Sequence, residues 1–187
     1  MDQVANQDGL DHARFLRISF AVARAAREAG HHPFGAILVG PDGTVLMEQG
    51  NASASGGDMT AHAERVLMTR ASRAYTPAIL ARCTLYTSAE PCAMCAGAAY
   101  WAGVGRVVYG LAERDLRTIT GDHPENPTLD LPCRTVFAAG QRTVEVIGPL
   151  LVEEAAALHD GFWSDPAGPG PAAFGRIRPG SLVPGAP

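Results

Sequence analysis

The order of apolar and polar residues along the chain predicts alternating helices and strands. Residues 11–30 place apolar side chains at helical spacing and stop at Gly30, so this segment is expected to form one amphipathic helix. Residues 33–50, PFGAILVGPDGTVLMEQG, predict two β-strands joined by a tight turn at Pro-Asp-Gly, residues 41–43. The chain therefore opens with a helix followed by an antiparallel hairpin.

The pattern then alternates short apolar runs with helical segments. A polar, glycine-rich loop leads to Thr60, the expected N-cap of a helix over residues 62–75. Pro91 suits the first turn of a second helix. The remaining predictions are strands at residues 83–88, 105–110 and 143–148, helices at residues 90–103 and 149–163, and a long irregular loop from Leu111 to Pro132.

Strands that alternate with helices predict an α/β layered domain with a mixed sheet. The opening hairpin is antiparallel, and the later strands are connected through helices. Two polar motifs, at residues 60–64 and 90–95, fall where a strand or loop gives way to a helix N-terminus. Ligands of α/β sheets bind preferentially at that edge, so both motifs are candidates for a functional site.

Composition adds limits on the class of protein. The 187 residues suit one domain, expected at residues 1–163, and a Pro/Gly-rich tail is expected at residues 164–187. No apolar run is long enough to span a bilayer, and the N-terminus lacks the apolar core of a secretory signal, so a cytoplasmic location is expected. The net charge is −4 and the fifteen basic residues, all arginine, are dispersed. This charge pattern favours a small-molecule substrate over a nucleic acid.

Four cysteines raise the question of disulfides, metal binding or redox chemistry. In a cytoplasmic chain the Cys-x-x-Cys pair, Cys92 and Cys95, is more typical of a metal or redox site than of a disulfide. Cys83 and Cys133 lie in a strand and after the long loop, and they are expected to be buried as small apolar side chains. The electropositive start of a helix lowers the pKa of a thiol, which favours zinc as the partner of Cys92 and Cys95.

His62 is the expected third zinc ligand, because it holds the equivalent position at the start of the other helix. Three protein ligands leave a fourth tetrahedral position open, which is typical of a catalytic zinc. A zinc ion of this kind lowers the pKa of a bound water to about 7 and makes a nucleophile available at neutral pH. Glu64 follows two residues later, about 200° around a regular helix, so the two side chains converge only if His62 is still non-helical. Glu64 is therefore predicted to carry protons without binding the metal.

The combination of His-x-Glu with Pro-Cys-x-x-Cys is the zinc signature of nucleobase deaminases. Over residues 15–109, and more weakly to residue 163, the chain resembles the cytidine-deaminase-like superfamily. The resemblance implies a three-layer α/β/α fold with a five-stranded mixed sheet. It also implies zinc held by His62, Cys92 and Cys95, proton transfer by Glu64, and a homodimer.

The stretch from Leu85 to Gly110 looks most like bacterial guanine deaminases, so guanine is the first expected substrate. By this resemblance, Glu125 is a second catalytic acid, with Asp122 as its alternative. The residues expected at the base pocket are Phe34, Asn51, Ala63, Trp101 and Asp122. The loop around Glu125 does not align cleanly with that branch, which leaves cytosine, isocytosine and ammeline-type triazines open. Residues 159–163, HDGFW, are expected either to end the last helix or to cover the site.

Two rival hypotheses remain at the level of sequence. Transfer-RNA adenosine deaminases share EPCAMCAG and GRVVYG, but they usually carry a valine at the position of Phe34 and a basic C-terminal helix. Residues 152–163, VEEAAALHDGFW, contain Glu153, Glu154 and Asp160 instead of a basic helix. The other rival is a structural zinc module without activity, and Glu64 argues against it because a structural site needs no proton carrier.

Overall fold

The apolar segments form a five-stranded sheet with the strand order β2-β1-β3-β4-β5. The computed structural model describes residues 9–53 and 58–164. Its strands are β1 (Gly35–Val39), β2 (Val45–Gly50), β3 (Thr84–Ala89), β4 (Arg106–Leu111) and β5 (Glu145–Ile147). β1 is antiparallel to β2 and β3, whereas β3, β4 and β5 are mutually parallel. The predicted mixed sheet and its opening hairpin are confirmed.

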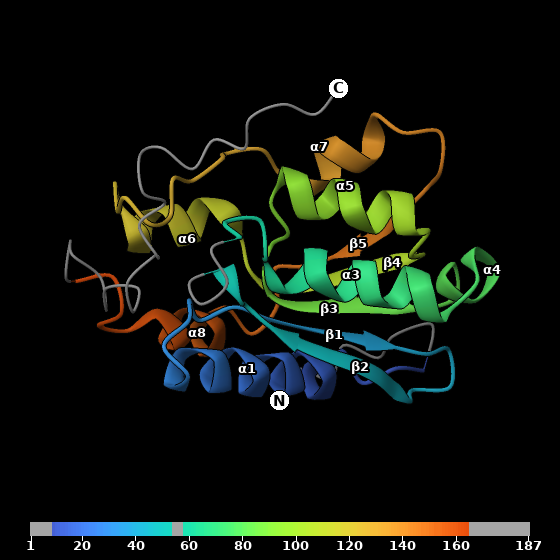
Figure 1. Ribbon diagram of the computed structural model, residues 1–187, viewed down its shortest axis with the longest axis horizontal. Helices are drawn as coiled ribbons and strands as arrows, with labels where there is room; N and C mark the ends of the chain where they lie inside the picture. Colours follow the sequence, from blue (N-terminus) through green and yellow to red (C-terminus); the bar gives the residue numbers. More distant parts are fainter. Residues whose placement is uncertain (1–8, 54–57, 165–187) are drawn as a thin grey trace, which may run out of the picture.

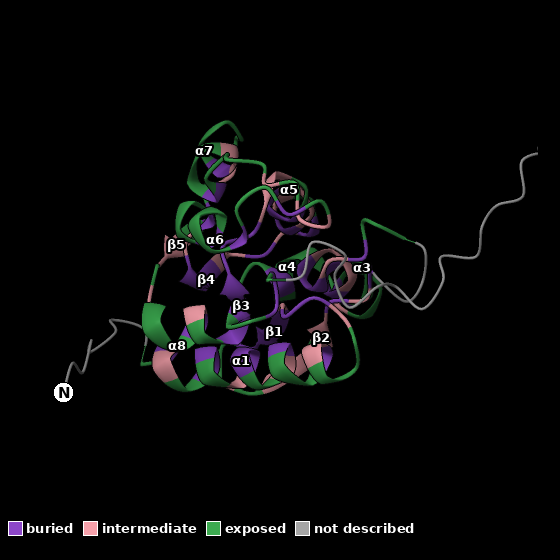
Figure 2. Cartoon of the chain, turned by 90° about the vertical axis from the view of Figure 1, so that its left-hand side faces the viewer, coloured by how far each residue is buried: buried purple, intermediate pink, exposed green. Residues whose placement is uncertain are grey.

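Helices cover both faces of this sheet. α1 (His12–Glu28) and α8 (Val152–Ala156) lie on one face, and α3 (Ala63–Ala74) and α5 (Ala93–Ala102) lie on the other (Figure 1). Figure 2 shows the buried sheet between the helices, with the exposed sides of α1 and α8 turned outward. The short elements are α4 (Pro77–Leu80), α6 (Glu113–Thr120), α7 (Cys133–Ala138) and the 3-10 helix η1 (Ala157–His159). The three-layer α/β/α architecture is thus confirmed.

Two apolar cores follow from the period-two alternation of the strands. In β1, Ile37 and Val39 face the core under α1, whereas Ala36 and Leu38 face the core under α3. The same division separates Leu85 from Tyr86 in β3. Both faces of β1 and β3 are buried, and the strand predicted at residues 83–88 is confirmed. β1 is entirely apolar, whereas β3 also buries Thr84, Thr87 and Ser88.

The observed boundaries differ from the predicted ones in three places. His62, rather than Thr60, is the N-cap of α3, because the Thr60 hydroxyl bonds instead to Asp58 Oδ1 at 2.6 Å. The expected loop from residue 111 to 132 contains α6, and α7 follows it, although neither helix was predicted. The last helix is shorter than expected, ending in η1 at residue 159.

The expected tail at residues 164–187 lies almost entirely outside the described residues. Among the described helices, none combines the length and apolar character that a membrane crossing requires.

Candidate active site

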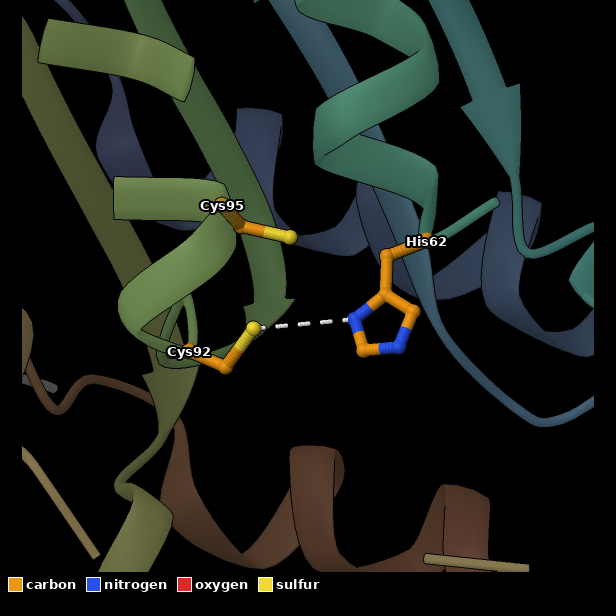
Figure 3. A group of neighbouring side chains, drawn as sticks. All are labelled: His62, Cys92 and Cys95. Atoms are coloured by element: carbon orange, nitrogen blue, oxygen red, sulfur yellow. Dashed lines mark hydrogen bonds between the residues drawn. The ribbon is translucent and has the colours of Figure 1, made fainter. Parts of the chain in front are cut away.

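The two polar motifs meet at one edge of the sheet, each at the start of a helix. Cys92 is the N-cap of α5 and Cys95 lies in its first turn, directly after β3. His62 is the N-cap of α3, the neighbouring helix on the same face of the sheet. Figure 3 shows the three side chains pointing toward one another from these two helices. The predicted metal ligands are thus brought together by the adjacent packing of α3 and α5.

Their geometry fits zinc. One donor atom from each of His62, Cys92 and Cys95 lies within 4.8 Å of the others, and Cys92 Sγ is 3.7 Å from His62 Nδ1. A tetrahedral zinc with ordinary Zn–S and Zn–N bond lengths separates a sulfur from a nitrogen by roughly 3.6 Å. Hydrogen bonding to Cys95 lowers the pKa of Cys92 to about 4, so this ligand is a thiolate at neutral pH. The nitrogen and two sulfurs form a donor set that zinc prefers.

Glu64 lies beside the ligands without being one of them. His62 has an extended backbone, with φ −61° and ψ 148°, so the helix begins only after it. This cap conformation allows His62 and Glu64 to face the same cavity although they are two residues apart. The Glu64 side chain is buried, and burial raises its pKa to about 7. A carboxyl with this pKa can both accept and donate a proton at neutral pH.

A cavity of about 300 Å³ opens in front of His62, Glu64 and Cys92. Its wall combines apolar side chains with convergent polar ones, as is typical of small-molecule sites. Three predicted residues, Phe34, Asn51 and Glu125, line it. The lining residues not predicted from the sequence are His32, Ser53, Met59, Ala89, Glu90, Met94, Glu113, Leu116, Asn126, Pro127, Thr128 and Leu129.

Asn51 and Glu125 are each held by a specific partner. Asn51 Oδ1 accepts hydrogen bonds from Ser53 N at 3.0 Å and Ser53 Oγ at 2.8 Å, and among the described residues no acceptor pairs with its Nδ2 amide. Glu125 Oε2 lies 3.1 Å from His32 Nε2. Burial lowers the pKa of His32, which favours the neutral ring, and its Nε2 pairs with the Glu125 carboxyl. His123 Nδ1 accepts from the Glu125 backbone at 3.3 Å.

Glu113 is the main polar residue of the cavity that sequence reasoning missed. It is the first residue of α6, at the end of β4, and only 6% of its surface is exposed. Burial raises the pKa of Glu113 to about 7. The sequence feature that could have indicated Glu113 is its place shortly after the strand predicted at residues 105–110. The following segment contains several other polar residues, so this feature did not distinguish Glu113 from them.

Three predicted pocket residues do not reach the cavity. The Ala63 side chain is buried in the core under α3, and Asp122 is exposed in the loop after α6. Trp101 is 85% exposed and packs edge-on against Tyr100 near the end of α5, two turns beyond the metal ligands. Their side chains therefore give no support to contact with a ligand in this cavity.

The segment 159–163 packs behind the cavity wall and does not close it. Trp163 is buried against His32 and Phe34, with ring centroids 5.2 Å and 6.3 Å apart. Neither Phe162 nor Trp163 is among the cavity-lining residues. The segment thus supports the wall from outside, which is closer to the expectation that it simply ends the last helix.

The fold and the site together define a zinc-dependent hydrolytic deaminase of the cytidine-deaminase-like class. Residues 10–111 match the cytidine and deoxycytidylate deaminase zinc-binding region. The chain belongs to this family and is an enzyme of the deaminase class with zinc as its cofactor.

Individual relatives differ in their substrates. The chain is 42% identical over 152 residues to the probable cytosine deaminase of Schizosaccharomyces pombe, a match that covers 80% of this chain and 90% of the relative. It is 38% identical over 107 residues to the guanine deaminase of Bacillus subtilis, covering 57% and 68%. The tRNA-specific adenosine deaminase of Agrobacterium fabrum is 37% identical over 100 residues, covering 54% and 65%.

Among solved structures, the guanine deaminase of Nitrosomonas europaea superposes with a TM-score of 0.64 and 26% identity. This match covers 83% of this chain and 84% of that one.

Proposed function

We propose that the protein deaminates a free nucleobase hydrolytically, with guanine as the first candidate and xanthine and ammonia as products. The observation that carries this proposal is a small cavity in which Glu64 stands beside the zinc ligands and Asn51 presents an amide donor. The extended likeness to the guanine deaminase of N. europaea supports guanine.

The chain's own residues divide the chemistry between proton transfer and orientation. Zinc, when bound, supplies Lewis-acid activation of the attacking water. Glu64 takes a proton from the attacking water and delivers it to the ring nitrogen. It then takes the proton of the hydroxyl that has been added to the carbon and delivers it to the departing amino group. Water thus adds its oxygen to the amino-bearing carbon, the carbon–nitrogen bond breaks, and ammonia leaves. Phe34 offers an apolar wall for the ring, and Glu125 is oriented by His32 to act as a second acid.

Ammonia release from a panel of substrates tests the proposal. The zinc-loaded protein is incubated with guanine, cytosine, isocytosine, adenine, ammeline and the nucleosides, and ammonia is measured for each. The expected result is turnover of guanine above all nucleosides. The proposal fails if no free base is deaminated by a protein that carries one zinc per chain.

Cytosine is the second candidate, favoured by 42% identity to the S. pombe relative over nearly its whole length. Turnover of cytosine with little turnover of guanine would select this candidate and keep the proposed chemistry.

A tRNA substrate is disfavoured by the net charge of −4 and by the acidic first turn of α8, with Glu153 and Glu154. A gel shift with tRNA at low salt checks this point. Tight binding that weakens steeply with salt would contradict the free-base proposal.

A further inference from the structure

The position of Glu113 in the cavity is fixed through its backbone. Its N–H donates to Glu90 Oε2 at 3.1 Å, and the other oxygen of Glu90 accepts from Cys133 N at 2.9 Å. The buried Glu90 carboxylate therefore holds the first residue of α6 against the end of β3. Because the backbone is held, the Glu113 side chain is directed into the cavity that also contains Glu64 and Cys92.

The Glu113 carboxyl opens on the cavity, and within the described part of the chain it has no protein donor. Among the described residues, no side chain or backbone group donates a hydrogen bond to its oxygens, and no arginine pairs with it. The ionisable groups that act on it are Cys92, Glu90, Glu64 and Asp130, all of them anionic when ionised. A carboxyl that opens on a cavity is hydrated when the cavity is empty, and it needs a new donor when a ligand displaces that water. An acceptor that faces a ligand cavity without a protein donor therefore points to a donor on the ligand.

Asn51 lines the same cavity and complements this acceptor. Ser53 N can only donate, so the Asn51 atom that it meets is Oδ1. Within residues 9–53 and 58–164 no acceptor meets Nδ2, so this amide can donate to an acceptor on the ligand. Besides Glu64 and Glu125, the cavity thus offers an amide donor at Asn51 and a carboxyl acceptor at Glu113. A heterocycle with a carbonyl oxygen and a ring N–H matches this pair.

We propose that Glu113 is a specificity residue that accepts a hydrogen bond from the ring N–H which carries the sugar in a nucleoside. This inference rests on the proposed function. In a free base that nitrogen bears a hydrogen, whereas in the nucleoside the glycosidic bond replaces it. A nucleoside therefore leaves the buried carboxyl without a partner, and this loss selects free bases over nucleosides.

The test compares free bases with their N-methylated forms, in which only that hydrogen is replaced. The substrates are guanine with 9-methylguanine and cytosine with 1-methylcytosine, and kcat/KM is measured for each. Wild-type enzyme is expected to prefer the free base. In Glu113→Leu, kcat/KM for the free base is expected to fall at least about 10-fold, with a change below about 2-fold for the methylated form.

Two further variants keep the test decisive. Glu113→Gln keeps a neutral acceptor, so it is expected to lie between wild type and Glu113→Leu, and it replaces that variant if leucine prevents folding. Glu153→Leu changes a glutamate in the first turn of α8, on the surface, and is expected to leave the preference unchanged. Two results would overturn this inference and leave the proposed function intact. One is an equal loss of kcat/KM on free and methylated bases in the Glu113 variants, and the other is a wild-type enzyme that accepts nucleosides as well as it accepts bases. A wild type inactive on every free base would instead overturn the proposed function.

Discussion

His62 and Glu64 illustrate how one residue's backbone conformation separates two chemical roles. Within a regular helix their side chains would point about 200° apart. Because His62 is an extended N-cap, both reach the same cavity, one at the metal position and the other beside it. The glutamate lies buried in the first turn of α3, outside the group of donor atoms formed by His62, Cys92 and Cys95.

Replacing Glu64 with alanine is expected to abolish turnover while zinc remains bound. General acid–base catalysis by a positioned side chain typically contributes 10²–10⁴-fold, so kcat should fall by at least about 100-fold. Zinc content by atomic absorption and kcat on the preferred base are measured together. Loss of zinc from Glu64→Ala would show that the glutamate belongs to the ligand set.

Replacing one of the cysteine ligands is expected to weaken zinc binding, whereas Glu64→Ala is expected to leave zinc bound. Cys95→Ser should lower zinc affinity by more than about 100-fold, because a hydroxyl is a poor ligand for a site selected by soft donors. The matched control is Cys83→Ser, since Cys83 is also buried but its thiol bonds only to Ile79 O at 3.3 Å. Competition with a chromogenic chelator measures both affinities. Equal zinc binding by Cys95→Ser and wild type would exclude this residue as a ligand.

The site residues that could be predicted share a local signal. The zinc ligands and Glu64 lie within two short motifs whose spacing at helix starts carries the chemistry. Glu113 and His32 were missed because their proximity depends on which strands are neighbours in the sheet. Trp101 shows the converse, since an aromatic residue close in sequence to a motif lies on the far, exposed part of the same helix.

At the scale of elements, the apolar pattern predicted all five strands of the sheet. For β3, β4 and β5 the predicted bounds agree with the observed ones to within two residues at each end. The helices α6 and α7 escaped because they are short and border polar residues, so few apolar positions reveal their period. Their formation depends on contacts from elsewhere. Glu90 binds the first backbone N–H of each, a tertiary interaction that no local pattern contains.

The packing of helices on β4 gives a prediction about Gly110. A Cβ at this position would lie 2.6 Å from Ser88 O, 2.8 Å from the Phe20 ring and 2.9 Å from Ala155 Cβ. Gly110→Ala is therefore expected to lower the free energy of unfolding by about 1–3 kcal/mol through overpacking. Urea unfolding measures the loss.

The matched control for Gly110→Ala is Gly97→Ala, in the middle of α5, where an added Cβ meets nothing within 4 Å. This variant is expected to gain up to about 1 kcal/mol from helix propensity. Equal stabilities of the two variants would contradict the close approach of β4 to α1 and α8.

At the scale of the whole molecule, the C-terminal turn joins α1 to the cavity wall. Arg27 of α1 donates to Leu158 O at 2.8 Å and to Asp160 O at 2.7 Å. Trp163 follows this turn and packs on Phe34, which lines the cavity. Unfolding of residues 158–163 would therefore remove the support of Phe34 and change the shape of the cavity.

His159 makes the stability of this segment dependent on pH. Its ring is 1% exposed, its Nδ1 accepts from Trp163 Nε1 at 3.1 Å, and burial lowers its pKa to about 4. The unfolded chain, with a histidine pKa of about 6.5, binds more protons than the folded chain between these values. The contribution of His159 is therefore complete above pH 6.5 and is lost as the pH falls toward 4. Between pH 7 and pH 5 the loss amounts to about 2 kcal/mol.

Urea unfolding of wild type and His159→Gln at pH 7 and pH 5 measures this contribution. Glutamine can still accept from Trp163, and the comparison of slopes cancels the titration of the zinc ligands and the carboxyls. The stability of the variant is expected to depend on pH by about 2 kcal/mol less than that of wild type over this range. Identical slopes would mean that the pKa of His159 is the same in the folded protein as in the unfolded chain.

The Glu90 carboxylate has a consequence for how such a pocket can diversify. Its two oxygens accept hydrogen bonds from the backbone of residues 113 and 133, so the segment between these residues is held at both ends at the sheet edge. Residues 113–133 contribute Glu113, Leu116 and Glu125 to the cavity, whereas the metal-binding residues come from elsewhere in the chain. The length and sequence of this segment can change without displacing α3 or α5. The same metal site can thereby serve a different ring when about twenty contiguous residues of the pocket are exchanged.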